Sequence, residues 1–324
     1  MKKAALITIA AIFSLTVVAQ VTDGETKLRS VNGDTTSGWK TGGMVSLNLS
    51  QSSFTNWSAG GLNSIGINGL LSGFANYHKG NSTWDNMLDI GYGLLRQGDN
   101  AQFIKTDDKI DFSSKFGQLA SKSWYYAAVL NFKTQMTNGY KYPNDSVAIS
   151  RLFAPAYLIG AIGMDFKPSP KITAFIAPFT SKTTFVLDDD LSNLGAFGVT
   201  PAVYDGNLLR TPGQKVRSEF GGYLRVVYNQ TFFKDKSVSV LSKLDLFSNY
   251  LHNPQNIDVN WESIFSFKVN KYISATITTQ LIYDDDIIIK VDRNDDGVVD
   301  DADGAGGPRI QFKEILGIGF SYKF

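Results

Sequence analysis

Oxygen-bearing side chains recur at alternate positions in one acidic segment, Asp292–Asp303 (DRNDDGVVDDAD). The spacing matches a calcium loop, in which positions 1, 3, 5, 9 and 12 offer side-chain oxygens, position 6 is glycine and position 7 offers a carbonyl. These positions fall on Asp292, Asn294, Asp296, Gly297, Val298, Asp300 and Asp303. Because the last position is aspartate and no flanking helices are visible, the segment resembles the calcium loops of extracellular modules more than an EF-hand sensor. We expect a structural Ca²⁺ here; the alternative is a solvated acidic loop.

Hydrolytic chemistry is a second possibility, because serine or aspartate can act with histidine. The chain holds 2 histidines, His78 beside Lys79 and His252 in the segment LHNPQN. No GxSxG, HExxH or Walker pattern occurs. We therefore expect no enzymatic activity and keep a lipase- or protease-like surface hydrolase that uses His252 as the alternative.

Composition narrows the class of protein. There is no cysteine, and 31 basic residues face 30 acidic ones. The fold therefore has no disulfide, and the near-neutral charge offers no support for nucleic-acid binding.

The N-terminus has the pattern of a secretory signal peptide. Lys2 and Lys3 precede an apolar run that ends in the small-residue pattern Val17-x-Ala19. We expect cleavage after Ala19, and residues 20–39 to form a periplasmic segment.

Beyond this segment the apolar residues alternate with a period of two, which is the signature of strands with one oily and one wet face. The segment 257–269 shows this most clearly. One face carries Ile257, Val259, Trp261, Ser263, Phe265, Phe267 and Val269, and the other carries Asp258, Asn260, Glu262, Ser266 and Lys268. No stretch reaches the roughly 20 apolar residues of a membrane helix.

The connections between these strands alternate between tight turns and longer loops, as in an outer-membrane barrel with short periplasmic turns and long external loops. The sequence thus predicts an all-β, antiparallel up-and-down transmembrane barrel of about 12 strands over residues 40–324. The calcium-type loop, residues 285–308, then lies outside the cell. A soluble secreted β protein is the weaker alternative.

A barrel of about 12 strands is roughly 24 Å across at the backbone, so inward side chains leave a narrow lumen. Charged and polar residues of both signs are expected to face inward and to pair across it. They are Asp85, Asp89, Asp111, Lys115, Asn131, Lys133, Arg217, Glu219, Arg225, Lys243, Asp245, Asp258, Glu262 and Lys268. The long segment 187–215 is expected to cap the outer mouth.

Two stretches, 51–71 with its FTNWSAGG core and GPRIQFKEILGIGFSYKF at 307–324, resemble a family of Gram-negative outer-membrane barrels described only as a domain of unknown function. The resemblance implies a fold and no activity. The terminal Phe324 also resembles the signal by which the barrel-assembly machinery recognises its clients. Expected partners are therefore this machinery and outer-membrane lipids, with localisation in the outer membrane.

These observations predict a non-enzymatic outer-membrane barrel. It would be a narrow or plugged channel for a small solute of unknown identity, or a structural barrel of the envelope, with a calcium-stabilised outer loop.

Overall fold

The computed structural model describes residues 37–53, 62–98, 102–233, 237–268, 270, 273–289 and 306–323. The expected signal peptide (1–19), the FTNWSAGG core (54–61), the calcium-type residues Asp292–Asp303 and the terminal Phe324 lie outside these residues. Their expected roles are therefore not tested by the fold.

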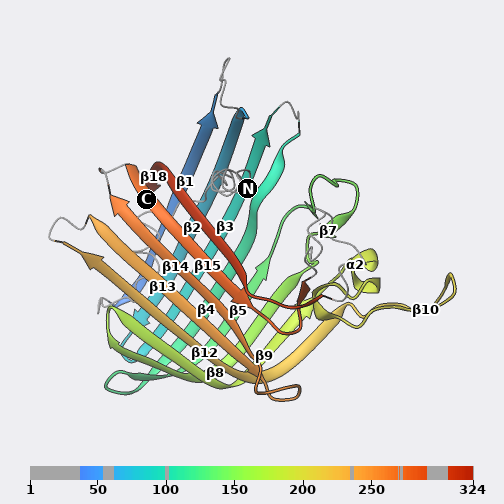
Figure 1. Ribbon diagram of the computed structural model, residues 1–324. Coiled ribbons are helices and arrows are strands. Elements are labelled where there is room, and N and C mark those ends of the chain that lie inside the picture. Colours follow the sequence, from blue (N-terminus) through green and yellow to red (C-terminus); the bar gives the residue numbers. More distant parts are fainter. Residues whose placement is uncertain are drawn as a thin grey trace, which may run out of the picture.

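The described chain folds into a closed antiparallel barrel (Figure 1). Its strands are β1 (Gly38–Ser52), β2 (Ser64–Lys79), β3 (Ser82–Gln97), β4 (Ile104–Ser121), β5 (Trp124–Thr134), β8 (Ala156–Ser169), β9 (Ile172–Phe185), β12 (Val216–Phe232), β13 (Val238–Asn249), β14 (Ile257–Lys268), β15 (Ile273–Tyr283) and β18 (Gln311–Lys323). Each strand pairs with the next of this series, and β18 pairs with β1. The expected up-and-down barrel of about twelve strands is confirmed.

The connections follow the expected alternation. Residues 80–81, 122–123 and 170–171 form tight turns, whereas 135–155 and 186–215 are long. Because a tight turn fixes the register of the two strands it joins, β2 and β3 pair without a slip from Ser64↔Gln97 to Lys79↔Ser82. The register in turn decides which charged side chains become neighbours inside the barrel.

The ring closes through a short seam. Within the described residues, β1 and β18 pair from Met44↔Lys323 to Leu47↔Phe320 and no further. By contrast, β1 pairs with β2 along its whole length, from Gly38↔His78 to Ser52↔Ser64. The seam is therefore the place where the barrel wall has the fewest ladder hydrogen bonds.

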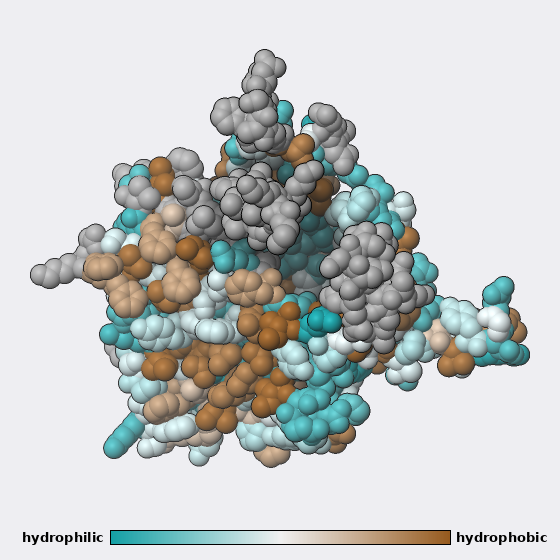
Figure 2. All heavy atoms as spheres, viewed as in Figure 1, coloured by the Kyte–Doolittle hydropathy of each residue, from teal (hydrophilic) through white to brown (hydrophobic). Residues whose placement is uncertain are grey.

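The two faces of the strands differ as the alternation requires. Large apolar side chains on the outside are exposed, among them Leu49, Leu130, Ile162 and Phe179. Figure 2 shows hydrophobic residues gathered over the strands that face the viewer. The inside instead buries polar residues; those buried almost completely include Ser46, Asn48, Asn68, Ser72, Asp89, Asn131, Asp165, Glu219 and Ser266. An oily outside around a polar inside is the arrangement of a barrel that sits in lipid.

Among the described residues, no helix combines the length and the apolar character needed to span a bilayer.

One end of the barrel carries the long loops, which lie on the right in Figure 1. They contain β6 (Gly139–Tyr140), β7 (Ala148–Ser150), α2 (Asp189–Asn193), a 3-10 turn η2 (Ala196–Gly198), β10 (Val203–Asp205) and β11 (Leu208–Thr211). Ala154, Val186, Leu191 and Val199 form a small buried core between the loops 135–155 and 186–215. Asp188 caps α2 by accepting a hydrogen bond from the Leu191 amide at 3.0 Å. The segment 187–215 thus forms a packed structure at this end, as expected for a cap.

A further pair of short strands lies beside the calcium-type segment. β16 (Ile288–Ile289) pairs antiparallel with β17 (Gly307–Pro308). This ladder brings together the two ends of the segment that contains Asp292–Asp303.

Candidate functional site in the barrel lumen

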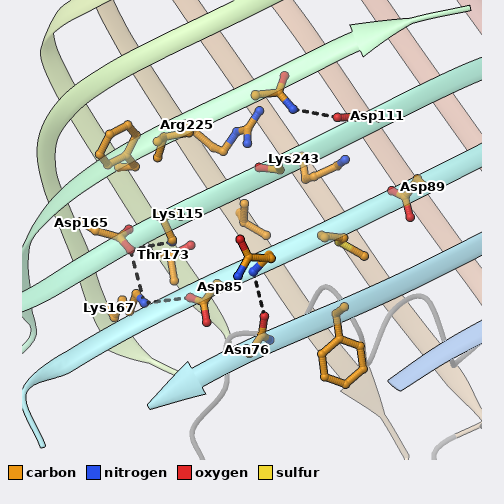
Figure 3. Close-up of a pocket in the computed structure, with 18 of the residues that line it drawn as sticks. Asn76, Asp85, Asp89, Asp111, Lys115, Asp165, Lys167, Thr173, Arg225 and Lys243 are labelled. Atoms are coloured by element: carbon orange, nitrogen blue, oxygen red, sulfur yellow. Dashed lines mark hydrogen bonds and ion pairs between the residues drawn. The ribbon is translucent and has the colours of Figure 1, made fainter. Parts of the chain in front are cut away.

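The barrel encloses a cavity of about 190 Å³, called here the inner cavity (Figure 3). Its walls come from strands on both sides of the lumen, from β2 and β3 round to β13. Charged residues lining it are Asp85, Asp89, Asp111, Lys115, Lys133, Asp165, Lys167, Arg225 and Lys243. Sequence reasoning placed all of these inside the barrel except Asp165 and Lys167 of β8.

One end of the inner cavity is an ion cluster on three strands. Lys115 of β4 donates to Asp165 of β8 at 2.6 Å, and Lys167 lies 3.4 Å from the same carboxylate. Lys167 also reaches Asp85 of β3 at 3.7 Å. Strands β4 and β5 separate β3 from β8, so the pairs of Lys115 with Asp165 and of Lys167 with Asp85 bridge strands that are not neighbours in the sheet. Figure 3 shows the four side chains converging.

The other end of the inner cavity carries ion pairs between neighbouring strands. The register places Asp111 opposite Lys133, Arg225 opposite Asp245, and Lys243 opposite Glu262. The corresponding N···O distances are 3.5 Å, 2.5 Å and 2.5 Å. Opposite charges at directly paired positions attract each other across the ladder. The alternation of the sequence thus translates, through the register, into a lumen whose charges neutralise one another.

Apolar side chains fill the lumen beside these charges, which sequence reasoning did not expect. Ala127, Val129, Ala161, Phe175, Ala177, Tyr223 and Phe247 form one buried cluster. Leu241 and Ile264 form another on β13 and β14. The Tyr223 hydroxyl donates to Asp245 at 2.6 Å, so the aromatic cluster also supports an ion pair. The lumen is therefore filled by packed apolar groups as well as by the expected polar ones.

A third group, the outer ion cluster, lies nearer the long loops. Lys182 of β9 lies 2.6 Å from Asp258 of β14, 3.3 Å from Asp284 and 3.6 Å from Glu219. Glu219 also accepts from Arg217 at 3.0 Å. Because β12 and β13 separate β9 from β14, the bond between Lys182 and Asp258 crosses part of the lumen. We call the ion-paired residues from β3 round to β14, in all three groups, the charged wall.

Three carboxylates of this region approach one another closely. Asp258, Asp284 and Asp285 have oxygens within 4.8 Å of one another. Lys182 bonds to the first two, and Asn256 donates to Asp285 at 2.6 Å. The lysine thus supplies positive charge to this group.

The lumen face of β1 and β2 differs from the charged wall. Ser46 and Asn48 of β1 and Asn68 and Ser72 of β2 are buried and uncharged, and we call these four residues the neutral strip. Ser72 donates to Asp89 of β3, which marks the border with the charged wall. Both polar side-chain atoms of Asn48, and Nδ2 of Asn68, are buried without a hydrogen-bond partner in the part of the chain that the structure describes. The alternating pattern gave no signal for this site.

The remaining candidates lie elsewhere. His252 is near Arg217 and Glu219 at an outer pocket, and its Nε2 lies 3.2 Å from Asn253. Within the described residues, no serine or carboxylate bonds to this histidine. Lys268, expected inside, is exposed at the end of β14. The calcium-type ligands lie outside the described residues, so their geometry is not tested.

Comparison with known proteins gives a family match over part of the chain. The model of a family described as a protein of unknown function (DUF3078) matches residues 49–140. This range includes the FTNWSAGG core, so the expected family resemblance is confirmed there; the stretch 307–324 lies outside the match. No curated protein matches the chain in sequence.

Solved structures with a similar course of the chain include two bacterial proteins. The translocator domain of the autotransporter NalP from Neisseria meningitidis has a TM-score of 0.36 and 8% identity, with 89% of this chain and 90% of that chain covered. The COG4313 outer membrane channel from Pseudomonas putida F1 has a TM-score of 0.40 and 11% identity, with 91% and 99% covered.

Proposed function

We propose that this protein is a non-enzymatic outer-membrane barrel whose lumen is held closed by ion pairs and takes up only small solutes. The observation that carries the proposal is that ion pairs connect strands that are not adjacent in the sheet. Lys182 joins β9 to β14, and Lys167 joins β8 to β3. A side chain that reaches across a narrow lumen obstructs it, and its partner holds it there.

Packing supports the same conclusion. Phe175 and Tyr223 meet edge to face, with ring centroids 6.2 Å apart, beside the inner cavity. The inner cavity has room for a few waters or one small solute, because a single water needs at least about 10 to 15 Å³ of the same kind of volume. Bulk ionic flow requires a continuous column of water, which these groups interrupt.

Conductance in planar bilayers tests the proposal. We expect the purified protein to show no large, steady, porin-like current. The double variant Lys182→Met/Asp258→Leu removes both members of a crossing ion pair, and should raise the open probability or current several-fold. Asp284 and Glu219 also lose their contact with Lys182, while Glu219 keeps Arg217. Lys215→Met is the matched control, because Lys215 pairs with Asp189 on the exposed outer surface at 2.8 Å. Large stable currents through the unaltered protein would contradict a closed lumen.

Placement in the outer membrane rests on the oily outside and on the expected export signal. In this proposal the lipids contact side chains such as Leu130 and Phe179, which are exposed on the outside. Assembly would depend on the C-terminal strand, since β18 must pair with β1 to close the ring. Deleting Phe324 should then lower the yield of folded barrel in membranes, measured by heat-modifiable mobility on gels. An unchanged yield would argue against recognition through this residue.

The calcium proposal rests on the ligand spacing of Asp292–Asp303 and on what flanks it. The ladder of β16 and β17 brings the ends of the loop together, which lowers the entropy lost when a metal orders it. Asp286, just before β16, bonds to Arg217 of β12 and so ties this end of the loop to the barrel. A structural Ca²⁺ with millimolar-range affinity would suit an external loop.

Calorimetry and limited proteolysis on the folded barrel test this part. Calcium should release binding heat and protect residues 285–308 from cleavage. Asp296→Ala should abolish both effects, whereas Asp205→Ala, which removes an exposed aspartate of β10, should change neither. If Asp296→Ala behaves like the control, the loop is a solvated acidic segment.

A further inference from the structure

We infer that the neutral strip binds a small, uncharged, hydroxyl-rich solute, of which a monosaccharide is the simplest example. This inference rests on the proposed function as a closed barrel for small solutes. It starts from Asn48 and Asn68, which are directly paired across β1 and β2 and are 4% and 1% exposed. Both polar atoms of the Asn48 amide group and Nδ2 of Asn68 have no hydrogen-bond partner among the described residues. Buried polar groups of this kind are rare because leaving them unpaired is costly.

The chemistry of these atoms defines what would satisfy them. Two NH₂ groups can donate and one carbonyl can accept. A hydroxyl group both accepts from an NH₂ and donates to a carbonyl, so a solute with neighbouring hydroxyls can meet all three atoms. Ser46 and Asn48 are two residues apart, or about 7 Å along the strand, which is comparable to the width of one pyranose ring.

Charge excludes ionic solutes at this place. The neutral strip offers amides and hydroxyls, so an anion buried there would lack a compensating charge, and a cation would find only the Asp89 carboxylate at the border, which already has partners. Asp89, at the border, already accepts from Ser72 and would repel an anion. A neutral solute loses less hydration on entering and needs only hydrogen bonds in return.

A glycine on the neighbouring strand shapes the surroundings of Asn68. The position facing Asn68 on β3 is Gly93, and a Cβ there would collide with Asn68 Oδ1. Asn48 is the first lumen-facing residue of β1 beyond the last seam pair, Leu47↔Phe320. If the register continued, Asn48 would face Gly319, which also has no side chain. The Asn68 amide therefore lies over Gly93 of β3, in space that the side chain of any other residue would occupy.

Saturation-transfer NMR on the folded barrel in micelles tests the inference, with glucose as the probe and gluconate and glucosamine as anionic and cationic probes of similar size. Glucose should receive at least five times more transferred signal than either charged probe. The double variant Asn48→Leu/Asn68→Leu should reduce the glucose signal at least fivefold. Asn138→Leu, in an outer loop where the amide donates to Tyr140, is the matched control and should leave it unchanged.

A second variant guards against a folding defect. Gly93→Ala keeps both asparagines but displaces Asn68, and should also reduce the glucose signal. Equal signals from all three probes, or a glucose signal that survives both variants, would overturn the inference. A signal that appears only after deletion of residues 20–36 would assign the strip to the chain's own N-terminal segment and would overturn it too. Conductance of the same preparations reports separately on the closed lumen, so either proposal can fail alone.

Discussion

The charged wall and the neutral strip line the same lumen but satisfy their polar groups in different ways. In the charged wall, ions such as Arg225 and Asp245 find partners on a neighbouring strand or across the lumen. In the neutral strip, Asn48 keeps two buried polar atoms that find no partner within the described ranges. One side of the lumen is therefore closed by charged groups that pair with one another, whereas the other side keeps polar groups with unused hydrogen-bonding capacity.

The difference follows from what stands beside each region. The charged wall lies on strands that pair along most of their length, so the register repeatedly places opposite charges side by side. The neutral strip lies next to the seam, where the pairing of β1 with β18 is short. Charged side chains in the lumen need oppositely charged partners on neighbouring strands, whereas amides and hydroxyls can instead form hydrogen bonds with a solute or with water. This contrast predicts opposite responses to mutation.

The largest effect is expected from Arg225→Met in the charged wall. The change leaves Asp245 in the lumen with the Tyr223 hydroxyl but without the guanidinium that bonds it through Nε and Nη2. Removing one member of such a pair typically costs about 3 to 5 kcal/mol. Urea unfolding of the barrel in lipid vesicles measures the loss. The double variant Arg225→Met/Asp245→Leu should recover most of the lost stability. Equal stability of the single variant and the unaltered protein would show that the charged wall does not stabilise the barrel.

The next effect concerns the outside of the charged wall. Leu130 lies in the middle of β5 and is 45% exposed, and Val147 in an outer loop is 60% exposed. Leu130→Arg should destabilise the barrel by about 2 to 4 kcal/mol in a bilayer, because it places a charge in hydrocarbon. Val147→Arg should stay within about 0.5 kcal/mol, as for an ordinary surface change. Equal effects of the two would mean that the oily face of β5 does not contact lipid.

The sequence predicted the barrel because period-two alternation and alternating loop lengths are local properties. It also placed Asp111 and Arg225 inside the barrel, because each lies on the polar face of its alternating strand. It did not identify their partners, because pairing Lys182 with Asp258 requires the order of strands around the ring. The inward position of Ile264 was missed for a related reason: an apolar residue on the wet face has no signature until its neighbour Leu241 is known.

The neutral strip left no sequence signal at all. Ser46 and Asn48 look like ordinary polar-face residues, and the lack of a partner for the Asn48 amide among the described residues can be seen only once the neighbouring strands are placed. Asp165 is an intermediate case. Its inward position was not predicted, because the alternation of β8 is interrupted where the pairing with β9 shifts register. Pattern reasoning is therefore strongest where one strand suffices and weakest where three strands must be known together.

A smaller effect is expected at the border between the two regions. Ser72→Ala removes the hydroxyl that donates to the buried carboxylate of Asp89. Asp89 retains other interactions, so the loss should be about 1 to 2 kcal/mol, as for a hydrogen bond to a charged group. The same unfolding assay measures it, with Ser50→Ala on the exposed outer part of β1 as control. A change no larger than that of the control would show that Asp89 does not depend on the neutral strip.

The smallest effect on stability is expected inside the neutral strip, and its direction separates the two regions. Asn48→Leu replaces an amide that has no partner in the described part of the protein with an apolar group of similar volume, so no hydrogen bond between described groups is lost. The free energy of unfolding should change by less than about 1 kcal/mol or rise, because a buried unpaired polar group is removed. Transferred signal from glucose should fall in the same variant, as expected where binding and stability oppose each other. A loss of stability as large as that of Arg225→Met would show that Asn48 is bonded within the protein, and the two sides of the lumen would then be alike.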